Sequence, residues 1–459
     1  MPAGASNLFF GRNTKVYLQQ GTTIWELPVL NGYSFSQSTN SSQITLNEMS
    51  DATGRSRRGQ RAFNDSLAPA EWSFDIYTRP TLNTVVRTPD EALWSSLLGG
   101  SRFNATTASA AGVIPTAGSI AAGNAVTLTV PVAPHGGNHF EVGDIITVVG
   151  ASAATGTTAA SGTFTVTGAT TTSVTYVTNS PVSGVVTLTT PRIVSTTVTS
   201  TATETDFKPD SSNRSSLATF DLYFVLGGNS VTGANFADDE FTTIYRIDGC
   251  VANEATMNFE VDGIATVSWS GMGNRITELT SYNATAAITT GLNATNNMVR
   301  NRLTAASIIG VTPNAKTYGI TLTGGSITIS NNISFLTPET LGVVNTPIGH
   351  ITGTRSVTGN FTCYADELTN GSLDLYSDLL AATTTITNRF QLQLFVGGRN
   401  AAGTGPVGPG VMFDMGQCHL DIPTINNDDV IAFEVNFTAL PSTISGTDEL
   451  TRIRFAPPT

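Results

Sequence analysis

Apolar and polar residues alternate with a period of two through much of the chain, and this pattern predicts β-strands with one buried face. One such strand, FDLYFVLGG at 220–228, carries Phe220 and Phe224 on its apolar face and ends in two glycines. The segment FQLQLFVGG at 390–398 repeats the pattern, with Phe390 in the place of Phe220. A strand that occurs twice in this way indicates an internal duplication, which determines the architecture of the whole fold.

Four more pairs of segments recur in the same order in both halves. The matched segments are 41–50 with 324–334, 72–77 with 359–364, 90–100 with 372–382, and 250–269 with 418–437. Within them we match Ile44 with Ile327, Phe74 with Phe361, Cys250 with Cys418, and Trp269 with Phe437. Each match alone is weak because alternating strands resemble one another. Their common order indicates one duplicated β-rich unit.

The third matched pair has a different period. Segments 90–100 and 372–382 place apolar residues at i and i+4, as in Leu93 with Leu97 and Leu375 with Leu379. This spacing predicts a short helix with one apolar stripe. Acidic and hydroxyl residues precede each stripe and suit a helix start. Each copy of the unit is therefore expected to hold one helix.

The first copy carries an insertion that the second copy lacks. Between its helix and the strand at 220–228 lie residues 101–216, whereas the second copy needs only a few residues for the same connection. The inserted segment is rich in Thr, Ala and Gly and contains short alternating runs such as VTLTVPV and GTFTVTG. These runs predict a small all-β module, Ig-like or similar. A whole module is tolerated in one loop when its two ends lie close together.

The expected fold is mostly β. It consists of two tandem β-sandwich or barrel domains, each with one short helix, and the inserted β-module. The domain boundaries are 1–100 plus 217–278 for the first domain, 101–216 for the module, 279–312 for a linker, and 313–459 for the second domain. Within the linker, residues 296–310 are compatible with a short helix, while the remainder is polar and turn-rich.

The composition favours assembly over free diffusion. Only 12% of the residues are charged, against about 25% in ordinary soluble domains. A surface poor in charge loses little when another protein covers it. The formal net charge is −12, with 22 Lys plus Arg against 34 Asp plus Glu. A binder of nucleic-acid phosphates needs the opposite balance, whereas a surface that DNA passes without sticking agrees with it.

Three cysteines, Cys250, Cys363 and Cys418, stand at wide spacings. This odd number argues against a disulfide framework and against a structural zinc site. The N-terminal residues show no basic region followed by a long apolar core, so we predict no signal peptide. No stretch approaches the 18 apolar residues of a membrane span. We expect the chain to remain in a reducing cytosol until it assembles.

In each copy, strands are followed by a long polar hairpin, a short helix and a closing run of strands, and the first hairpin spans 44–77. This order resembles that of phage tail tube proteins. The resemblance implies two packed sheets per unit, six units per ring, a lumen lined by strands, and hairpins that reach the next ring. A chain with two units is similar to the type in which three chains form a pseudo-hexameric ring. The second hairpin, 331–361, departs from the first because it lacks a basic cluster and contains two prolines.

The resemblance also implies partners. They are further copies of the chain, a tape measure protein, tail-terminator and baseplate proteins, and a sheath protein if the tail is contractile. DNA would pass through the tube without specific binding, and the protein would reside in the virion tail after assembly in the host cytoplasm.

Two charged clusters are candidate contacts between subunits or rings. They are Arg55, Arg57, Arg58 and Arg61 in the first hairpin, and the acidic run Asp238, Asp239 and Glu240. The arginines could contact nucleic acid, but in an acidic chain we favour pairing with carboxylates of a neighbouring ring. The acidic run could bind calcium, although a solvated turn is the simpler interpretation.

No catalytic, cofactor or metal site is predicted. GTGPVG at 403–408 matches a dinucleotide-binding glycine pattern, but prolines and a strand-like segment follow it where a helix is required. His135 and His139 have the spacing of zinc ligands on a helix, but Gly136 and Gly137 between them favour a loop. The alternative functions are an all-β adhesin or receptor-binding tail protein, a β-sandwich hydrolase, and a capsid or decoration protein. The duplicated helix argues against the adhesin.

Overall fold

The computed structural model describes most of the chain. The described residues are 11–21, 23–44, 53, 61–83, 85–99, 102–104, 115–120, 124–130, 145–153, 160–170, 173–178, 186–195, 205–207, 209, 217–227, 235–237, 242–283, 288–289, 297–312, 316–341, 345–381, 389–399, 406–427, 430–441 and 448–456. This part is mostly β-structure, with two α-helices, α1 (Glu91–Leu98) and α3 (Ser372–Ala381). The mostly β fold class predicted from the sequence is confirmed.

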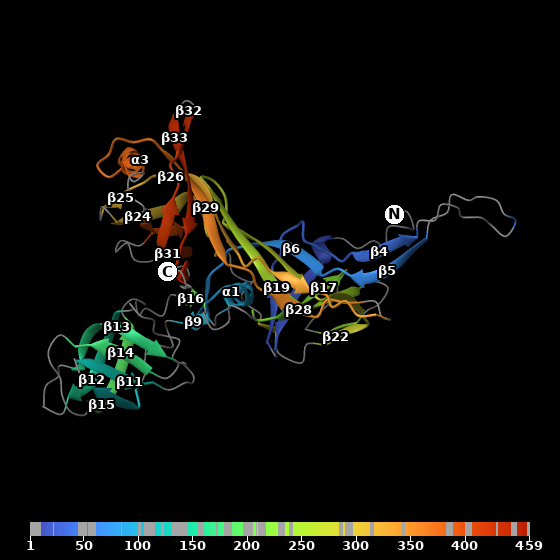
Figure 1. Cartoon of the computed structure of the whole chain (residues 1–459), viewed down its shortest axis with the longest axis horizontal. Helices are drawn as coiled ribbons and strands as arrows, with labels where there is room; N and C mark the ends of the chain where they lie inside the picture. The colour runs from blue at the N-terminus through green and yellow to red at the C-terminus, as the bar shows by residue number, and fades with distance from the viewer. Residues whose placement is uncertain are drawn as a thin grey trace.

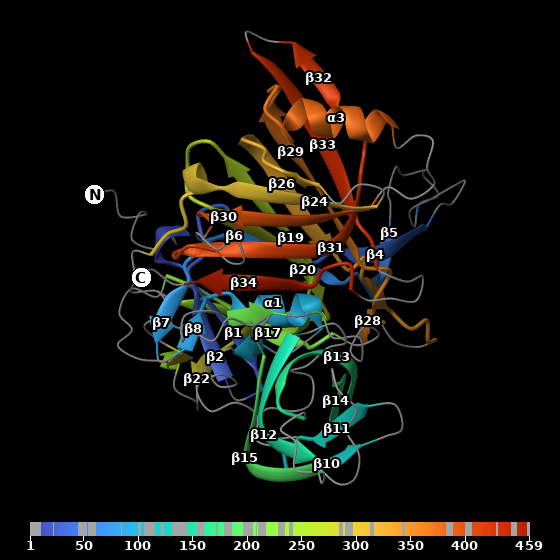
Figure 2. The same cartoon turned by 90° about the vertical axis from the view of Figure 1, so that its left-hand side faces the viewer.

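Each half of the chain contains an outer sheet with the same order of strands. In the first half, hydrogen-bonded neighbours run β2 (Thr23–Leu27), β1 (Lys15–Gln20), β17 (Phe220–Leu226), β19 (Thr243–Glu260) and β21 (Arg275–Leu279). In the second half they run β25 (Thr317–Tyr318), β24 (Ala305–Thr312), β30 (Arg389–Val396), β31 (Gly410–Leu420) and β34 (Arg452–Ala456). Figure 2 shows β30, β31 and β34 stacked in this second sheet.

The two outer sheets share a β-bulge at the same place. On β17 and β19, Phe220 lies opposite Cys250, but Leu222 lies opposite Ile247, so β19 contains one extra residue. On β30 and β31, Phe390 lies opposite Cys418 and Leu392 opposite Met415, which again leaves one extra residue. Because a bulge is a specific local feature of a strand pair, its repetition supports the match of Phe220 with Phe390 and of Cys250 with Cys418.

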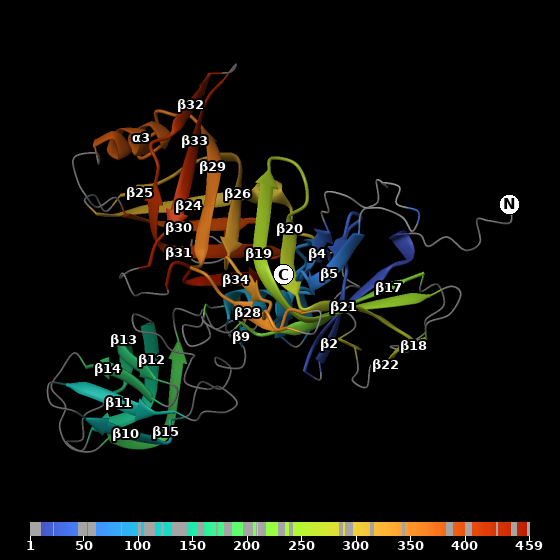
Figure 3. The same cartoon turned by 45° about the vertical axis from the view of Figure 1, so that its right-hand side comes forward.

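A third sheet joins the two halves, and we call it the shared sheet. Its strands, in hydrogen-bonded order, are β3 (Ser34–Ser36), β6 (Ala70–Tyr77), β20 (Thr266–Gly273), β19, β26 (Leu322–Ser330), β29 (Ser356–Tyr364), β33 (Ile431–Ala439) and β32 (Thr424–Asn427). Figure 3 shows β33, β29, β26, β19 and β20 side by side. Four of these strands, β3, β6, β20 and β19, belong to the first half of the chain, and the other four belong to the second half.

Strand β19 is long enough to serve two sheets. Up to Cys250 it pairs with β17 and β21 in the outer sheet, and from Val251 onward it pairs with β20 and β26 in the shared sheet. Gly249, at the change of sheet, has a φ of +60°. A side chain there would place its Cβ 2.3 Å from the Asn274 amide nitrogen. Glycine therefore permits the bend that carries one strand from the outer sheet to the shared sheet.

Each half also sends out a hairpin between the first two strands that it contributes to the shared sheet, β3 and β6 in the first half and β26 and β29 in the second. The first hairpin is β4 (Thr39–Ile44) with β5 (Arg61–Leu67), and the second is β27 (Ser334–Leu336) with β28 (Gly349–Ile351). The two hairpins touch, because Leu67 N–H donates to the carbonyl of Asn345 at 2.8 Å. Figure 1 shows the first hairpin projecting from the molecule.

The register of the sheets corrects two of the residue matches made from the sequence. Ile327 lies in β26, which pairs with β29. In the first half the strand that pairs with β6 in the same way is β3, and Phe35 of β3 is the equivalent of Ile327. Ile44 instead pairs with Arg61 in the hairpin, so its match with Ile327 is wrong. Trp269 and Val435 are the equivalent pair, since Phe74 lies opposite the former and Phe361 opposite the latter.

The second wrong match is that of Trp269 with Phe437, which lies two residues beyond its true equivalent, Val435. Such a shift keeps every side chain on the same face of a strand, because side chains alternate with a period of two. The apolar pattern alone cannot detect it. The match of Phe74 with Phe361 agrees with the ladder.

The inserted segment contains a six-stranded sheet. Its strands, in order, are β10 (Ala117–Ile120), β11 (Ala125–Thr129), β14 (Ser173–Val177), β13 (Gly162–Thr170), β12 (Ile145–Ala153) and β15 (Val186–Ser195). They enclose a separate core that includes Phe164 and Tyr176, whose stacked rings have centroids 4.6 Å apart. Gly118 of β10 packs against Val186 of β15, so the two ends of the sheet meet. The Ig-like subtype stays a prediction.

The insertion leaves and re-enters the rest of the molecule through neighbouring strands. β9 (Arg102–Asn104) pairs with β16 (Thr205–Phe207), and β16 also pairs with β34. The two ends therefore lie close together, as a tolerated insertion requires. In Figure 1 the module, in green, lies apart from the two outer sheets. The domain boundaries given above stay predictions.

The segment predicted as a linker contains ordered structure. A 3-10 turn, η4 (Asn301–Leu303), precedes β24, which pairs with β30 along its length. The possibility of a helix over 296–310 is wrong, because the alternating Ala306 and Ile308 are buried as strand residues. The remaining short elements are η1 (Gly11–Asn13), β7 (Thr81–Asn83), β8 (Val85–Arg87), β18 (Asn235–Ala237), β22 (Ser281–Asn283) and β23 (Ile288–Thr289).

One hydrophobic core spans both halves. It contains Trp72, Trp94 and Trp269 from the first half, and Phe361 and Phe413 from the second. The two predicted helices both form, and the stripe residues Leu93, Leu97, Leu375 and Leu379 are buried. The buried residues of the two copies therefore form one continuous cluster.

Gly271 of β20 lies at a point where the core leaves no room for a side chain. A Cβ at this position would lie 2.2 Å from the Val251 carbonyl oxygen and 2.3 Å from the Trp72 ring. We expect Gly271→Ala to lower the free energy of unfolding by about 1–3 kcal/mol, because overpacking forces neighbours apart. Gly319→Ala is the control, since nothing lies within 4 Å of its Cβ position. Equal thermal midpoints for the two variants would contradict the expectation.

Candidate functional site

One face of the shared sheet is built mainly from polar side chains. β6 and β20 alternate between buried and more exposed residues. The buried set faces the core, so the intervening residues form the opposite face. We call it the polar face. It consists of Ser34, Ser36, Glu71, Ser73, Asp75, Tyr77, Glu254, Thr256, Asn258, Glu260, Thr266, Ser268, Ser270, Met272, Gly324, Ser326, Thr328, Ser330, Ser356, Thr358, Asn360, Thr362, Tyr364, Thr424, Ala432, Glu434, Asn436 and Thr438.

The polar face runs without a break from one half of the chain to the other. A single row across five ladders shows this. In that row, directly opposite neighbours are Asp75 and Ser268, Ser268 and Thr256, Thr256 and Thr328, Thr328 and Thr358, and Thr358 and Thr438. Because the side chains of opposite residues share a face, the row forms one strip of hydroxyl groups that starts at a carboxylate.

Hydrogen bonds between neighbouring strands fix several of these side chains. The hydroxyls of Thr256 and Thr328 are 3.0 Å apart, across the junction between the two halves. The Ser326 hydroxyl donates to Asn360 Oδ1 at 2.8 Å, and Asn360 Nδ2 donates to Glu434 Oε1 at 3.0 Å. Side chains bonded to one another in this way are less available to hold a passing ligand.

The charge of the polar face has one sign. It carries five carboxylates, those of Glu71, Asp75, Glu254, Glu260 and Glu434, and no Lys or Arg among its described residues. Neutralising DNA phosphates requires cationic side chains. This face repels a phosphate backbone and offers it no ion pair. It is suited to line a passage for DNA, and it is unsuited to bind DNA.

None of these residues stands out as a site residue in the sequence. Their signal was present as the Ser, Thr, Asn and acidic positions between the apolar positions of each strand. That alternation says which residues share a face within one strand. It does not say which strands are neighbours, and so it could not show that eight segments from both halves form one surface.

A second feature, helix α1, is held at the contact between the two halves. Its last carbonyls accept hydrogen bonds from the second half, because Asn331 Nδ2 donates to Leu97 O at 2.7 Å and Arg355 Nη2 donates to Leu98 O at 2.9 Å. Arg355 Nη1 also lies 3.7 Å from Glu449 Oε1, with both side chains buried. These bonds satisfy helix-end carbonyls that would otherwise lack partners.

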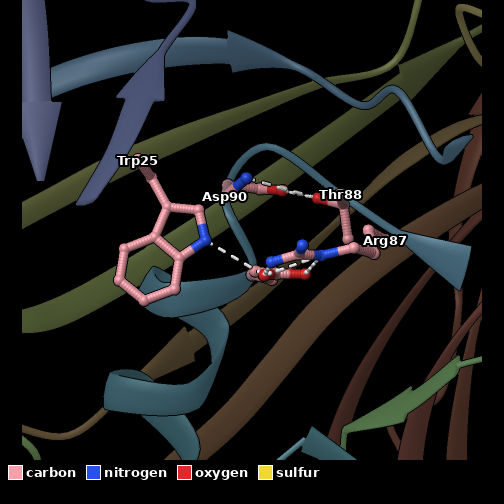
Figure 4. A network of polar contacts seen from close by, with 5 residues as sticks. Trp25, Arg87, Thr88 and Asp90 are labelled. Carbon is pink, nitrogen blue, oxygen red and sulfur yellow. Dashed lines mark hydrogen bonds and ion pairs between the residues drawn. The ribbon is translucent and has the colours of Figure 1, made fainter. Parts of the chain in front are cut away.

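The start of the same helix holds a buried acidic pair. The Trp25 indole N–H donates to Glu91 Oε1 at 3.0 Å, and Arg87 forms an ion pair with the same carboxylate. Thr88 donates to Asp90, and the Trp94 indole N–H donates to Asp90 Oδ2 at 3.0 Å. Figure 4 shows the contacts of Trp25, Arg87 and Thr88 around the two carboxylates. Burial raises the pKa of the Asp90 carboxyl to about 7, and the neighbouring Glu91 adds to the effect.

This pKa predicts a pH dependence of stability. The folded-state pKa lies above the ordinary value of 3.8, so the protonated form stabilises the fold below about pH 4 and this contribution is lost as the pH rises toward 7. Asp90→Asn is permanently neutral and should lack this loss. We expect the difference in unfolding free energy between wild type and Asp90→Asn to change by up to about 4 kcal/mol between pH 4 and 7. Parallel stability curves from urea titrations would contradict it.

No family model matches the chain. A curated relative does: the chain is 28% identical over 454 residues to "Tail tube protein pb6" of Escherichia phage T5, a match that covers 95% of this chain and 74% of the relative. An alignment of this length includes both halves and the insertion, so it concerns the whole architecture. Along almost its whole length the chain is similar to a phage tail tube protein, which supports a structural role in the tail tube.

The resemblance noted in the sequence is thereby confirmed. This tail tube protein has a structural role, belongs to the tail of the virion, and assembles with further copies of itself into the tube. The relative's name favours this function, and no observation favours the adhesin.

Most candidate contact residues of this tail tube protein lie outside the described residues. These are Arg55, Arg57, Arg58, Asp238, Asp239 and Glu240. Arg61 begins β5, where its backbone lies opposite Ile44 at the base of the first hairpin. The role of all seven in contacts between subunits stays a prediction.

The other motifs singled out in the sequence carry no visible site. The end of the glycine-rich loop, Pro406 to Gly408, leads into β31 instead of a helix, as the loop interpretation requires. His135 and His139 lie outside the described residues. All three cysteines are buried and unpaired, and burial raises the thiol pKa of Cys363 and Cys418 to about 12. In the described part, no cluster of three or more potential metal ligands occurs, and no helix is long and apolar enough to cross a membrane.

Proposed function

We propose that three copies of this tail tube protein close into a pseudo-hexameric ring and that such rings stack to form the tube. The observation that supports this is the shared sheet, in which two equivalent units lie side by side within one chain. Repeating the same step from chain to chain continues the sheet around a ring. Closure would pair the edge strands that otherwise promote aggregation.

In this ring the polar face lines the lumen. The core-facing side of the shared sheet is covered by the outer sheets, so the polar face is the side of the sheet that remains open. Five carboxylates per chain and the absence of Lys and Arg from its described residues suit a conduit through which the genome moves. DNA passes this surface without specific binding.

The hairpins provide contacts between stacked rings. They leave the chain next to each other, since Asn345 of the second hairpin bonds to Asp65 and Leu67 of the first. Both hairpins of one chain therefore reach the same neighbouring ring. Arg55, Arg57, Arg58 and Arg61 then pair with carboxylates of that ring, with Asp238, Asp239 and Glu240 as candidate acidic contacts.

Other components of the tail complete the assembly. The further partners are a tape measure protein, tail-terminator and baseplate proteins, and a sheath protein if the tail is contractile. The tube protein performs no catalysis and needs no cofactor. It contributes the polar face that lines the lumen and the contacts within and between rings.

Electron microscopy of the purified protein at increasing concentration, classified without imposed symmetry, tests the ring. We expect hollow rings or stacked tubes with three outer knobs per ring, one for each inserted module. Six knobs would mean six chains per ring and would contradict the pseudo-hexamer. Solid trimers or monomers at every concentration would contradict a ring of any kind.

A further inference from the structure

The shared sheet ends in two strands that have a partner on one side alone in the described part of the chain. β3 pairs with β6, and β32 pairs with β33, and neither has a second neighbour. The junction inside the sheet, where β19 meets β26, shows how two units of this protein join. In that junction Met257 lies opposite Ile327, Thr256 opposite Thr328, and Asn258 opposite Ser326.

The two terminal strands are the equivalents of the two junction strands. Met257 of β19 lies opposite Val267, and Ile425 of β32 lies opposite Phe433, which is the equivalent of Val267. The segments that lead from the matched cysteines to these residues also correspond. β19 contains one extra residue relative to its partner β20, and the chain from β31 to β32 contains one extra residue relative to its partner β33. β32 therefore repeats the second part of β19.

The equivalence of β3 and β26 follows in the same way. Phe35 lies opposite Trp72 on the outer side of β6, and Ile327 lies opposite Gly359 on the outer side of β29. Trp72 and Gly359 are equivalent because Phe74 and Phe361, two residues further along, occupy matching positions. Each strand also follows an antiparallel pair and precedes a hairpin.

Equivalent apolar residues differ in burial according to whether a neighbouring unit covers them. Met257 at the internal junction is 1% exposed, and its equivalent Ile425 is 50% exposed. The helices show the same difference, since Leu98 of α1 is 0% exposed beneath the second half and its equivalent Leu380 of α3 is 43% exposed. Both exposed residues belong to the second unit. Their equivalents in the first unit, Met257 and Leu98, lie where that unit contacts the second unit.

We propose that β32 of one chain pairs antiparallel with β3 of the next chain, with Ile425 opposite Phe35, Thr424 opposite Ser36, and Asn426 opposite Ser34. The partner is a second copy of this chain, and the inference rests on the proposed ring. It adds a register, obtained by transferring the β19–β26 ladder to the free edges. The pairing extends the row of the polar face formed by Glu434 and Thr424 to Ser36 of the next chain.

Disulfide cross-linking of assembled tubes tests the register. The matched variant combines Thr424→Cys with Ser36→Cys, both on exposed positions of the polar face. The control combines Thr424→Cys with Ser34→Cys, which shifts the pair by two residues and keeps the same face. Opposite residues of antiparallel strands have Cα atoms about 4.5–5.5 Å apart, whereas a disulfide cannot join Cα atoms more than about 7 Å apart. The natural cysteines are buried and do not interfere.

After mild oxidation, the matched variant should run as cross-linked trimers in denaturing electrophoresis and the shifted control as monomers. Electron microscopy of the reduced variants shows whether tubes have formed. Tubes in which the control cross-links and the matched pair does not would overturn this register while leaving the ring intact. Tubes in which neither pair cross-links would overturn the β32–β3 pairing. A wild-type protein that forms no rings would overturn the proposed function itself.

Discussion

Replacing Ile425 with aspartate should abolish ring formation and leave the chain folded. In the unassembled chain this side chain is half exposed, so a carboxylate there stays hydrated and costs little. In the ring it would occupy the position of Met257, which is 1% exposed. A carboxylate buried without a partner costs several kcal/mol, and the cost recurs at each of the junctions that must close together. Size-exclusion chromatography and electron microscopy measure the loss of rings.

Two controls separate this effect from general damage. Val149→Asp places the same charge at an aliphatic strand residue of the inserted module that is 52% exposed, and rings should persist. Ile425→Met installs the residue found at the equivalent internal position, and rings should form as in wild type. Rings of normal abundance from Ile425→Asp would show that β32 lies outside the interface.

Reversing the charge of the polar face should slow the passage of DNA, if this face lines the lumen as proposed. We expect the double variant Glu71→Lys with Asp75→Lys to assemble into tubes, because both side chains are exposed and lie on β6, which is not one of the two strands proposed to pair between chains. Each added lysine can pair with a phosphate and release condensed counterions, so the moving genome is held. Genome release from adsorbed virions that carry the variant, followed with a DNA-binding dye, should be several-fold slower than from wild type. Raised salt should restore the rate.

The matched control carries an equal change of charge elsewhere. Glu278→Lys with Glu367→Lys alters two exposed residues, on β21 and in the turn before α3, outside the polar face. Release from virions with this variant should proceed at the wild-type rate. If both double variants slow release equally, the effect depends on net charge, and the polar face does not line the lumen.

The sequence by itself determined the local elements and their repetition. The alternation around Phe220 and Phe390 and the i, i+4 stripe of Leu93 and Leu97 specify strands and helices, because the side chains of one buried face recur with the period of the element. The order of these elements was enough to show the duplication and to locate the insertion after the first helix.

The tertiary structure alone decided how the elements pair. Ile44 resembles Ile327 in its neighbours along the chain, yet β26 occupies the place of β3, and Ile44 lies in the hairpin. Likewise the true partner of Trp269 is two residues from the one that the pattern suggested. Pairing depends on hydrogen bonds between segments far apart in sequence, and a pattern with a period of two is unchanged by a shift of two residues. For the same reason, the polar face and the free edges of β3 and β32 became visible only when the neighbours of each strand were known.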